Sequence, residues 1–142
     1  MQTEFLGPVF RFDHVMLRVQ DLERSIGFYT QHFGMQVLRR TDYPGGKFTN
    51  AFLGYAPENA ATALELTWNW EREEPYAKGE AFGHLAFTVP DVRAAAAYLE
   101  SRGVRIRTPP KQMAHGTRII AFVLDPDDYL IELVEPLRSP AT

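Results

Sequence analysis

The sequence of 142 residues contains no cysteine, so disulfide bonds, cysteine-ligated metal sites and thiol catalysis are excluded. No apolar run approaches the roughly 20 residues of a membrane-spanning helix, and the first residues lack the basic and apolar segments of a signal peptide. The net charge is −3, without any run of Lys or Arg, so a nucleic-acid partner is not expected. These absences are typical of a cytoplasmic protein that binds neither nucleic acid nor membrane.

What the sequence does contain is an internal repeat. Four residues recur at a constant offset of 70 positions: Phe12, His14, Val19 and Asp21 as Phe82, His84, Val89 and Asp91. In each copy apolar and polar residues alternate, which predicts a strand, and the aspartate follows where the N-cap of a helix is expected. An apolar stripe at helical spacing then runs to Gly34 or Gly103, which predicts one helix in each copy.

Three further strands are expected after each helix. They are predicted over residues 35–40, 48–55 and 63–70 in the first copy, and over residues 104–107, 118–124 and 129–134 in the second. Residues 42–46 and 108–116 are expected to form turns or loops. Each copy therefore has the predicted order βαβββ.

The fold class that follows is α+β, with two βαβββ modules whose mixed, curved sheets form a cleft. Module one spans about residues 12–70 and module two about residues 82–135, within a single domain over residues 1–142. Residues 71–81 are predicted to be a linker, because charge, proline and glycine break both periodicities. Each module is too small to cover its own sheet, so the modules must pack on each other or on another chain.

Each module also ends in a strand with one glutamate between aliphatic residues. Glu65 and Glu132 occupy these positions, and a buried carboxylate is costly unless it is paired or binds a cation. Alone, each histidine could be a hydrogen-bonded core residue and each glutamate a solvated one. In repeat register, His14, Glu65, His84 and Glu132 instead favour a mixed nitrogen and oxygen site for a divalent transition metal.

Such a metal with octahedral preference would keep two positions for water or substrate, which is typical of a catalytic site. The other two histidines, His32 and His115, have no repeat partner. We expect both to lie at the surface.

Several longer motifs resemble those of glyoxalase I (lactoylglutathione lyase), of the vicinal oxygen chelate superfamily. The resemblance runs from about residue 12 to residue 135 and is carried by five segments: residues 14–19 (HVMLRV), 21–29 (DLERSIGFY), 65–70 (ELTWNW), 82–84 (FGH) and 125–133 (DPDDYLIEL). It implies the glyoxalase fold and a homodimer with shared active sites. Each site would take His14 and Glu65 from one chain and His84 and Glu132 from the other.

The resemblance also implies a reaction, the isomerisation of the methylglyoxal–glutathione hemithioacetal to S-lactoylglutathione. In it a divalent metal polarises the substrate oxygens while a glutamate moves a proton from C1 to C2. We expect Glu132 to be the base, with Glu65 serving the other proton. The short chain, with histidine as its first ligand, resembles the family members activated by Ni²⁺ or Co²⁺. Zn²⁺ remains a possible metal.

Arg18 and Asn69 are the expected substrate-binding residues. Each follows a proposed ligand by four residues, so each lies on the same strand face as that ligand and about 13 Å away, at about 3.3 Å per residue. If their strands are parallel and adjacent, they lie together, and family members hold the γ-glutamyl end of glutathione at these positions. The alternative is a structural ion pair for Arg18 and a strand end at Asn69.

Two positions depart from the family pattern. Glu80 stands where some members have a basic residue that binds glutathione. The sequence therefore leaves open whether the thiol cofactor is glutathione. One of Lys78, Lys111 and Arg118 could substitute for the missing basic residue. Asp128 stands at a usual glycine, in a turn where aspartate tolerates a left-handed conformation at modest cost.

Two functions other than the lyase activity are also compatible with the sequence. One is an epimerase or dioxygenase of the same superfamily, although a dioxygenase needs two histidines and only one carboxylate. The other is a non-catalytic protein that sequesters a ligand in the dimer cleft.

Overall fold

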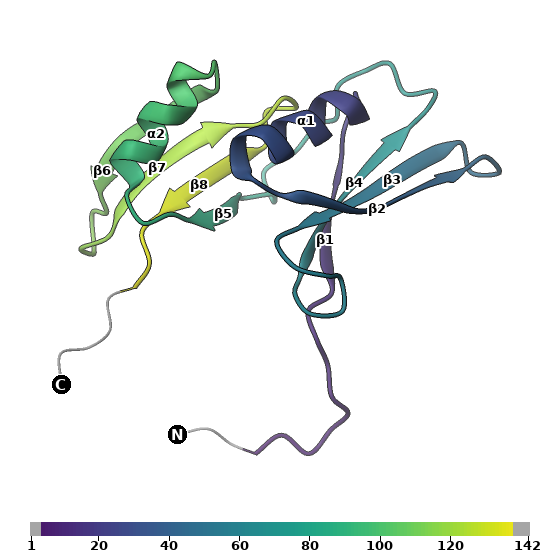
Figure 1. Ribbon diagram of the computed structural model, residues 1–142, viewed down its shortest axis with the longest axis horizontal. Helices are drawn as coiled ribbons and strands as arrows, with labels where there is room; N and C mark the ends of the chain where they lie inside the picture. Colours follow the sequence, from purple (N-terminus) through teal and green to yellow (C-terminus); the bar gives the residue numbers. More distant parts are fainter. Residues whose placement is uncertain (1–3, 138–142) are drawn as a thin grey trace.

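The computed structural model describes residues 4–137, which form two four-stranded mixed sheets with one helix each (Figure 1). Module one consists of β1 (His14–Arg18), α1 (Leu22–Phe33), β2 (Gln36–Tyr43), β3 (Phe48–Gly54) and β4 (Ala63–Asn69). Module two consists of β5 (Leu85–Thr88), α2 (Val92–Ser101), β6 (Arg105–Gln112), β7 (Ile119–Leu124) and β8 (Leu130–Val134). The predicted βαβββ order is confirmed in both modules.

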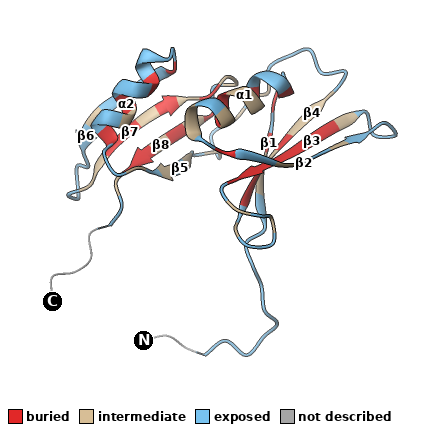
Figure 2. Cartoon of the chain, in the orientation of Figure 1, coloured by how far each residue is buried: buried red, intermediate tan, exposed pale blue. Residues whose placement is uncertain are grey.

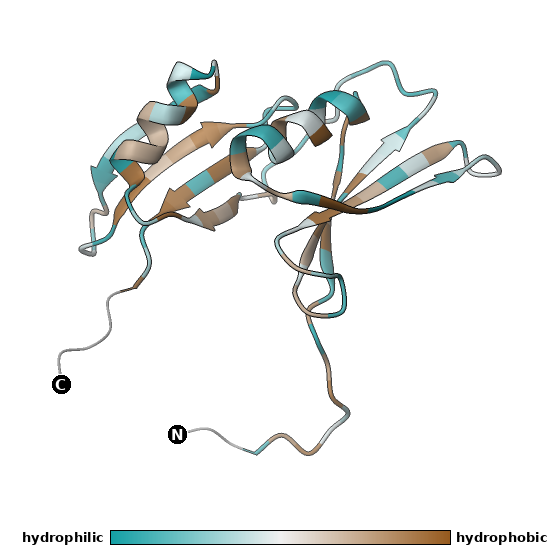
Figure 3. Cartoon of the chain, viewed as in Figure 1, coloured by the Kyte–Doolittle hydropathy of each residue, from teal (hydrophilic) through white to brown (hydrophobic). Residues whose placement is uncertain are grey.

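The two sheets have the same topology. Their strand orders are β1-β4-β3-β2 and β5-β8-β7-β6, and the first strand pairs with the last in parallel while the other pairs are antiparallel. Buried residues concentrate on the central strands of each sheet (Figure 2), and the same strands of module two are strongly hydrophobic (Figure 3). Neither helix among the described residues has the length and apolar character that crossing a bilayer requires.

The helices begin and end where their cap residues predict. The Asp21 carboxylate accepts a hydrogen bond from the Arg24 backbone N–H (3.1 Å), and Asp91 repeats this with Ala94 (3.0 Å). Gly34 follows α1 with a φ of 69°, in the left-handed region that glycine adopts without a Cβ clash.

Two strands extend several residues past their predicted ends. Strand β2 continues to Tyr43, past the expected end at residue 40, because its whole length pairs with β3. Strand β6 continues to Gln112, through Pro109 and Pro110, which were assigned to a loop. This strand lies at the edge of its sheet, and its register with β7 shifts between Thr108 and Lys111, so the prolines interrupt no regular ladder.

Residues 4–13 form an extended arm that leaves the sheets (Figure 1). Its large apolar side chains are at least 68% exposed: Phe5, Leu6, Val9, Phe10 and Phe12. Arg11 fixes the end of the arm, since its guanidinium donates to the Glu58 backbone carbonyl (2.8 Å).

A buried carboxylate joins the modules. Asp125, in the turn before β8, is fully buried and accepts hydrogen bonds from the Tyr29 hydroxyl of α1 (2.7 Å) and from the backbone N–H groups of Asp127 and Tyr129. Burial raises the pKa of Asp125, although these hydrogen bonds oppose the shift. In return, the Tyr129 hydroxyl donates to the Arg18 carbonyl of β1 (2.7 Å). The modules therefore pack on each other, as one of the two predicted arrangements requires.

Asp125→Ala should lower the free energy of unfolding by about 3 kcal/mol, because one buried hydroxyl and two buried N–H groups lose their acceptor. Tyr29→Phe removes only one of these hydrogen bonds, so we expect a loss of about 1 kcal/mol. Urea denaturation of the two variants and the unchanged chain measures both losses. Equal losses for the two variants would contradict the central role of the carboxylate.

Candidate metal centre

In module one, β1 and β4 bring His14 and Glu65 together. The strands are adjacent and parallel, with Met16 opposite Glu65, so His14 and Glu65 share the face opposite the buried Leu17. His14 Nε2 lies 3.4 Å from Glu65 Oε2. The glutamate side chain is 13% exposed, and the histidine side chain is 37% exposed.

Module two repeats this arrangement with β5 and β8. Ala86 lies opposite Glu132, and His84, just before β5, places its Nε2 3.6 Å from Glu132 Oε2. The exposed fractions, 40% for His84 and 18% for Glu132, are close to those in module one. The chain thus contains two equivalent half-sites: half-site one is His14 with Glu65, and half-site two is His84 with Glu132.

Each half-site fits two ligands of a divalent metal. Ligand atoms bound at about 2.1 Å to one ion lie about 3–3.4 Å apart, close to the observed separations, and imidazole with carboxylate suits a transition metal. Among residues 4–137, no three His, Asp or Glu side chains come close enough to hold one ion. Within one chain, the two half-sites therefore stay separate.

Half-site one has a polar shell behind its ligands. His14 Nδ1 is hydrogen-bonded to Asp13 Oδ2 (2.6 Å), and the Asn50 amide donates to Glu65 Oε1 (3.1 Å). The hydrogen bond with His14, aided by the Arg11 guanidinium, holds the pKa of Asp13 below its ordinary value. Asp13 therefore stays an ionised acceptor.

Half-site two shares the aromatic packing of half-site one but not its polar shell. The Phe122 ring lies 5.3 Å from His84, edge to face, as Phe52 lies 5.2 Å from His14. Gly83 and Ile120 stand at the repeat positions of Asp13 and Asn50. Our sequence reasoning missed this asymmetry, although a comparison of the repeat copies next to each ligand would have found it.

Arg18 and Asn69 lie on the ligand face, further along the same two strands. Their strands, β1 and β4, are parallel and adjacent, as the predicted arrangement of Arg18 and Asn69 required. Arg18 lies opposite Thr67. The Asn69 amide donates to the Tyr76 hydroxyl (2.9 Å). Arg18 borders a cavity of about 300 Å³ that is also lined by Tyr76, Lys78, Phe82 and Tyr129.

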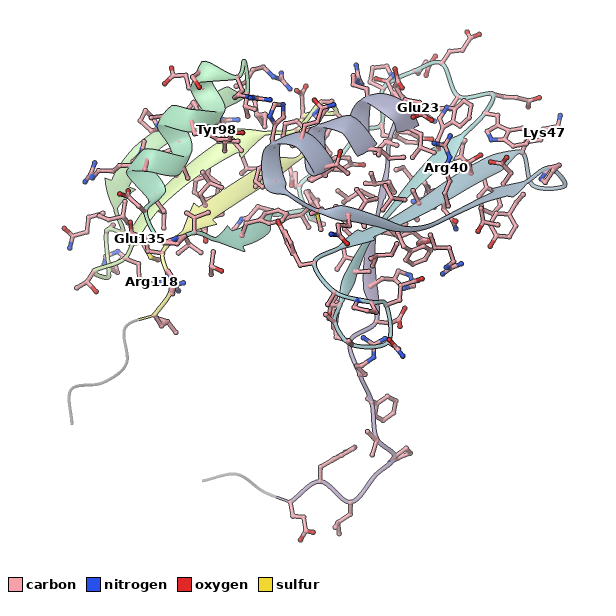
Figure 4. All side chains as sticks on the ribbon, in the orientation of Figure 1. Glu23, Arg40, Lys47, Tyr98, Arg118 and Glu135 are labelled. Atoms are coloured by element: carbon pink, nitrogen blue, oxygen red, sulfur yellow. The ribbon has the colours of Figure 1, made fainter. Side chains whose placement is uncertain are left out.

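Lys78 is the one of the three proposed substitute cations that borders this cavity. Lys111 lies on the edge strand β6, and Arg118 donates to the Glu135 carbonyl (2.9 Å) beyond β8 (Figure 4). Glu80 is exposed in the segment between the modules.

A larger groove of about 530 Å³ runs between the modules but contains none of the four proposed ligands. Its lining is mainly apolar and comes from both modules: Val15, Met35, Leu64, Leu85 and Phe87.

Two other sequence predictions have clear outcomes. Asp128 adopts the expected left-handed conformation (φ 67°), and its carboxylate lies 2.6 Å from the Arg105 guanidinium. His115 is exposed as predicted. His32 is instead half-buried against Phe28, its Nδ1 has no hydrogen-bond partner among the described residues, and burial lowers its pKa.

Comparisons with known proteins agree with the resemblance. The Glyoxalase/Bleomycin resistance protein/Dioxygenase superfamily matches residues 11–133. The chain is 47% identical to a lactoylglutathione lyase of Neisseria meningitidis serogroup A over 125 residues, which cover 88% of this chain and 90% of the relative.

Two solved structures are also similar. One is glyoxalase I from Zea mays, with 43% identity and a TM-score of 0.84; the match covers 92% of this chain and 46% of the maize chain. This chain thus spans about half the length of the maize protein. The other is the trypanothione-dependent glyoxalase I of Leishmania major, with 45% identity, a TM-score of 0.79, and coverage of 89% and 87%.

Proposed function

The chain belongs to the Glyoxalase/Bleomycin resistance protein/Dioxygenase superfamily, and from this premise we propose that it acts as a lactoylglutathione lyase. Its reaction is the metal-dependent isomerisation of the methylglyoxal–glutathione hemithioacetal to S-lactoylglutathione, which detoxifies methylglyoxal. Relatives with 44–47% identity over most of the chain carry this activity in their names. The observation that carries the proposal is the pair of equivalent half-sites, each with one imidazole and one carboxylate.

Two copies of the chain would complete the site. Each half-site supplies two donors, and three or more donors do not meet within residues 4–137. In a homodimer, His14 and Glu65 of one chain would face His84 and Glu132 of the other. A two-fold axis then makes two identical sites, because each chain contributes the same residues to the site it shares with its partner.

A divalent metal bound by these four residues supplies Lewis acidity to the substrate oxygens. Glu132 removes the proton from C1 of the hemithioacetal, and a proton returns at C2, so C1 is oxidised and C2 reduced without any external redox partner. Glu65 transfers the other proton of the reaction. Glu132 suits the role of base because no side chain among the described residues donates a hydrogen bond to it, whereas Asn50 holds Glu65.

The γ-glutamyl end of the substrate's glutathione moiety would lie at Arg18 and Asn69. A guanidinium pairs well with a carboxylate, and Lys78 adds a second cation at the same cavity. Two cations favour the acidic tail of glutathione and take the place of the basic residue that Glu80 does not provide.

The central test is formation of the thioester from methylglyoxal and glutathione, followed by its ultraviolet absorbance. Apoprotein should be inactive, and activity should return with Ni²⁺ or Co²⁺ to a greater extent than with Zn²⁺. A fully active Zn²⁺ form would refute the metal preference. If the protein is inactive with each of these ions, the lyase hypothesis is refuted. The epimerase, dioxygenase and ligand-sequestering hypotheses then remain.

Arg18→Ala should raise KM for the glutathione hemithioacetal about 10- to 100-fold with little change in kcat, because a charge-assisted hydrogen bond remote from the reacting carbons is lost. Lys78→Ala should have a smaller effect in the same direction. Lys111→Ala, which lies off the cavity, is the matched control. Steady-state kinetics measure these values, and an unchanged KM in Arg18→Ala would contradict the assigned position of the γ-glutamyl end of glutathione.

Glu132→Gln should abolish turnover while most metal binding is kept, because the amide can ligate but cannot accept the proton. His14→Ala should also be inactive. When the two inactive variants are mixed and allowed to exchange chains, activity should return to about a quarter of the original. Half of the dimers are then mixed, and each mixed dimer has one intact site out of two.

The same mixing experiment tests the shared site. If each site lay within one chain, the mixture of Glu132→Gln and His14→Ala would stay inactive. As a control, each variant is mixed with a second portion of itself in the same way. Any activity that appears in this control comes from the handling and not from chain exchange.

A further inference from the structure

The two half-sites differ in what holds their ligands, and we propose that Asp13 and Asn50 are positioning residues that make half-site one the tighter metal-binding half. The inference deepens the proposed function and rests on it. Neither residue would touch the metal or the substrate; each acts through the ligand behind which it lies.

Asp13 sets the orientation and tautomer of His14. With its Nδ1 hydrogen-bonded to the Asp13 carboxylate at 2.6 Å, the imidazole carries its proton on Nδ1. The lone pair of Nε2 then points toward Glu65 Oε2, 3.4 Å away. A carboxylate behind a histidine ligand fixes the ring and raises its basicity.

Asp13 is itself held in place, although its side chain is 62% exposed. The Arg11 guanidinium binds Asp13 Oδ1 (2.6 Å) and also donates to the Glu58 backbone carbonyl (2.8 Å). Because the carbonyl belongs to the connector between β3 and β4, the arm is fastened to module one at this point. The contact with Arg11 therefore favours the orientation in which the Asp13 carboxylate faces His14.

Asn50 plays the equivalent part for Glu65. It is 7% exposed, on β3, and its amide nitrogen donates to Glu65 Oε1 (3.1 Å), which leaves Glu65 Oε2 directed at His14. Its own carbonyl oxygen is buried and has no hydrogen-bond partner within residues 4–137. The opposite amide orientation would place two oxygens against each other, so the donor must face Glu65. An apolar residue would avoid the unpaired oxygen, and the hydrogen bond to Glu65 accounts for the asparagine.

Module two is an internal control for this reading. The aromatic contact of the histidine is the same in both modules, whereas Gly83 and Ile120 replace Asp13 and Asn50. The two half-sites thus differ mainly in the polar shell. Half-site one is pre-organised for the metal, and half-site two keeps Glu132 free for proton transfer.

Metal affinity of the 142-residue chain tests the proposal, with Ni²⁺ and a competing chelator as the probe. Asp13→Ala should weaken Ni²⁺ binding about 10- to 100-fold, which is the usual cost of losing a partner behind a metal ligand. Asn50→Leu, of similar size, should weaken it about 10-fold. Glu71→Gln should leave the affinity unchanged, because that exposed carboxylate pairs with Lys47 and lies outside both half-sites.

The His14 tautomer is a readout that a purely structural role would not move. In metal-free protein, at a pH where imidazole is neutral, nitrogen NMR should show His14 protonated on Nδ1. In Asp13→Ala the proton should shift toward Nε2, while His84 stays unchanged. This measurement needs no metal and no turnover.

A gain of affinity is also expected when the missing partner is added to half-site two. A Cβ at Gly83 would meet no heavy atom within 4 Å, and Gly83 is not in the left-handed region. Gly83→Asp therefore has room for a carboxylate beside His84 and should tighten Ni²⁺ binding by up to about 10-fold.

The outcomes separate the two proposals. If the unchanged protein binds Ni²⁺ but Asp13→Ala keeps both its affinity and its tautomer, the inference is overturned and the proposed function stands. If the unchanged protein binds no divalent metal, the proposed function fails, and the inference fails with it.

Discussion

The parallel pairing of the first and last strands is the constraint on which the rest of the structure depends. It occurs in both modules, between β1 and β4 and between β5 and β8. Because side chains alternate along a strand, this register places one histidine and one glutamate of each module on the same face. A shift by one residue in either pair would turn the glutamate toward the core, where an ionised carboxylate is unfavourable. The hydrophobic alternation that stabilises the sheets therefore also assembles the half-sites.

Much of this arrangement could be predicted from the sequence, because it follows from local patterns repeated at a fixed offset. The helix caps Asp21 and Asp91 and the in-chain pairing of each histidine with its glutamate are of this kind. The course of β6 through Pro109 and Pro110 was not predictable, since proline is read as a strand breaker unless the edge position is known. The Tyr29–Asp125 hydrogen bond was missed because it joins residues far apart in the chain that have no counterpart in the repeat.

The contact between Tyr29 and Asp125 matters for the site although neither residue belongs to a half-site. It anchors α1 of module one to the turn that leads into β8, and the hydrogen bond from Tyr129 to the Arg18 carbonyl ties the same turn to β1. The strands that carry Glu132 and Arg18 are thus connected through a few buried polar groups. Such groups favour one packing over its alternatives, because displaced positions leave donors unsatisfied.

The separation of the half-sites has a thermodynamic consequence for the proposed dimer. If one ion takes ligands from two chains, metal binding and association are linked, and each strengthens the other by the same factor. The apparent affinity for metal then depends on protein concentration, and chelation promotes dissociation. Dilution would loosen the ion even though no ligand changes.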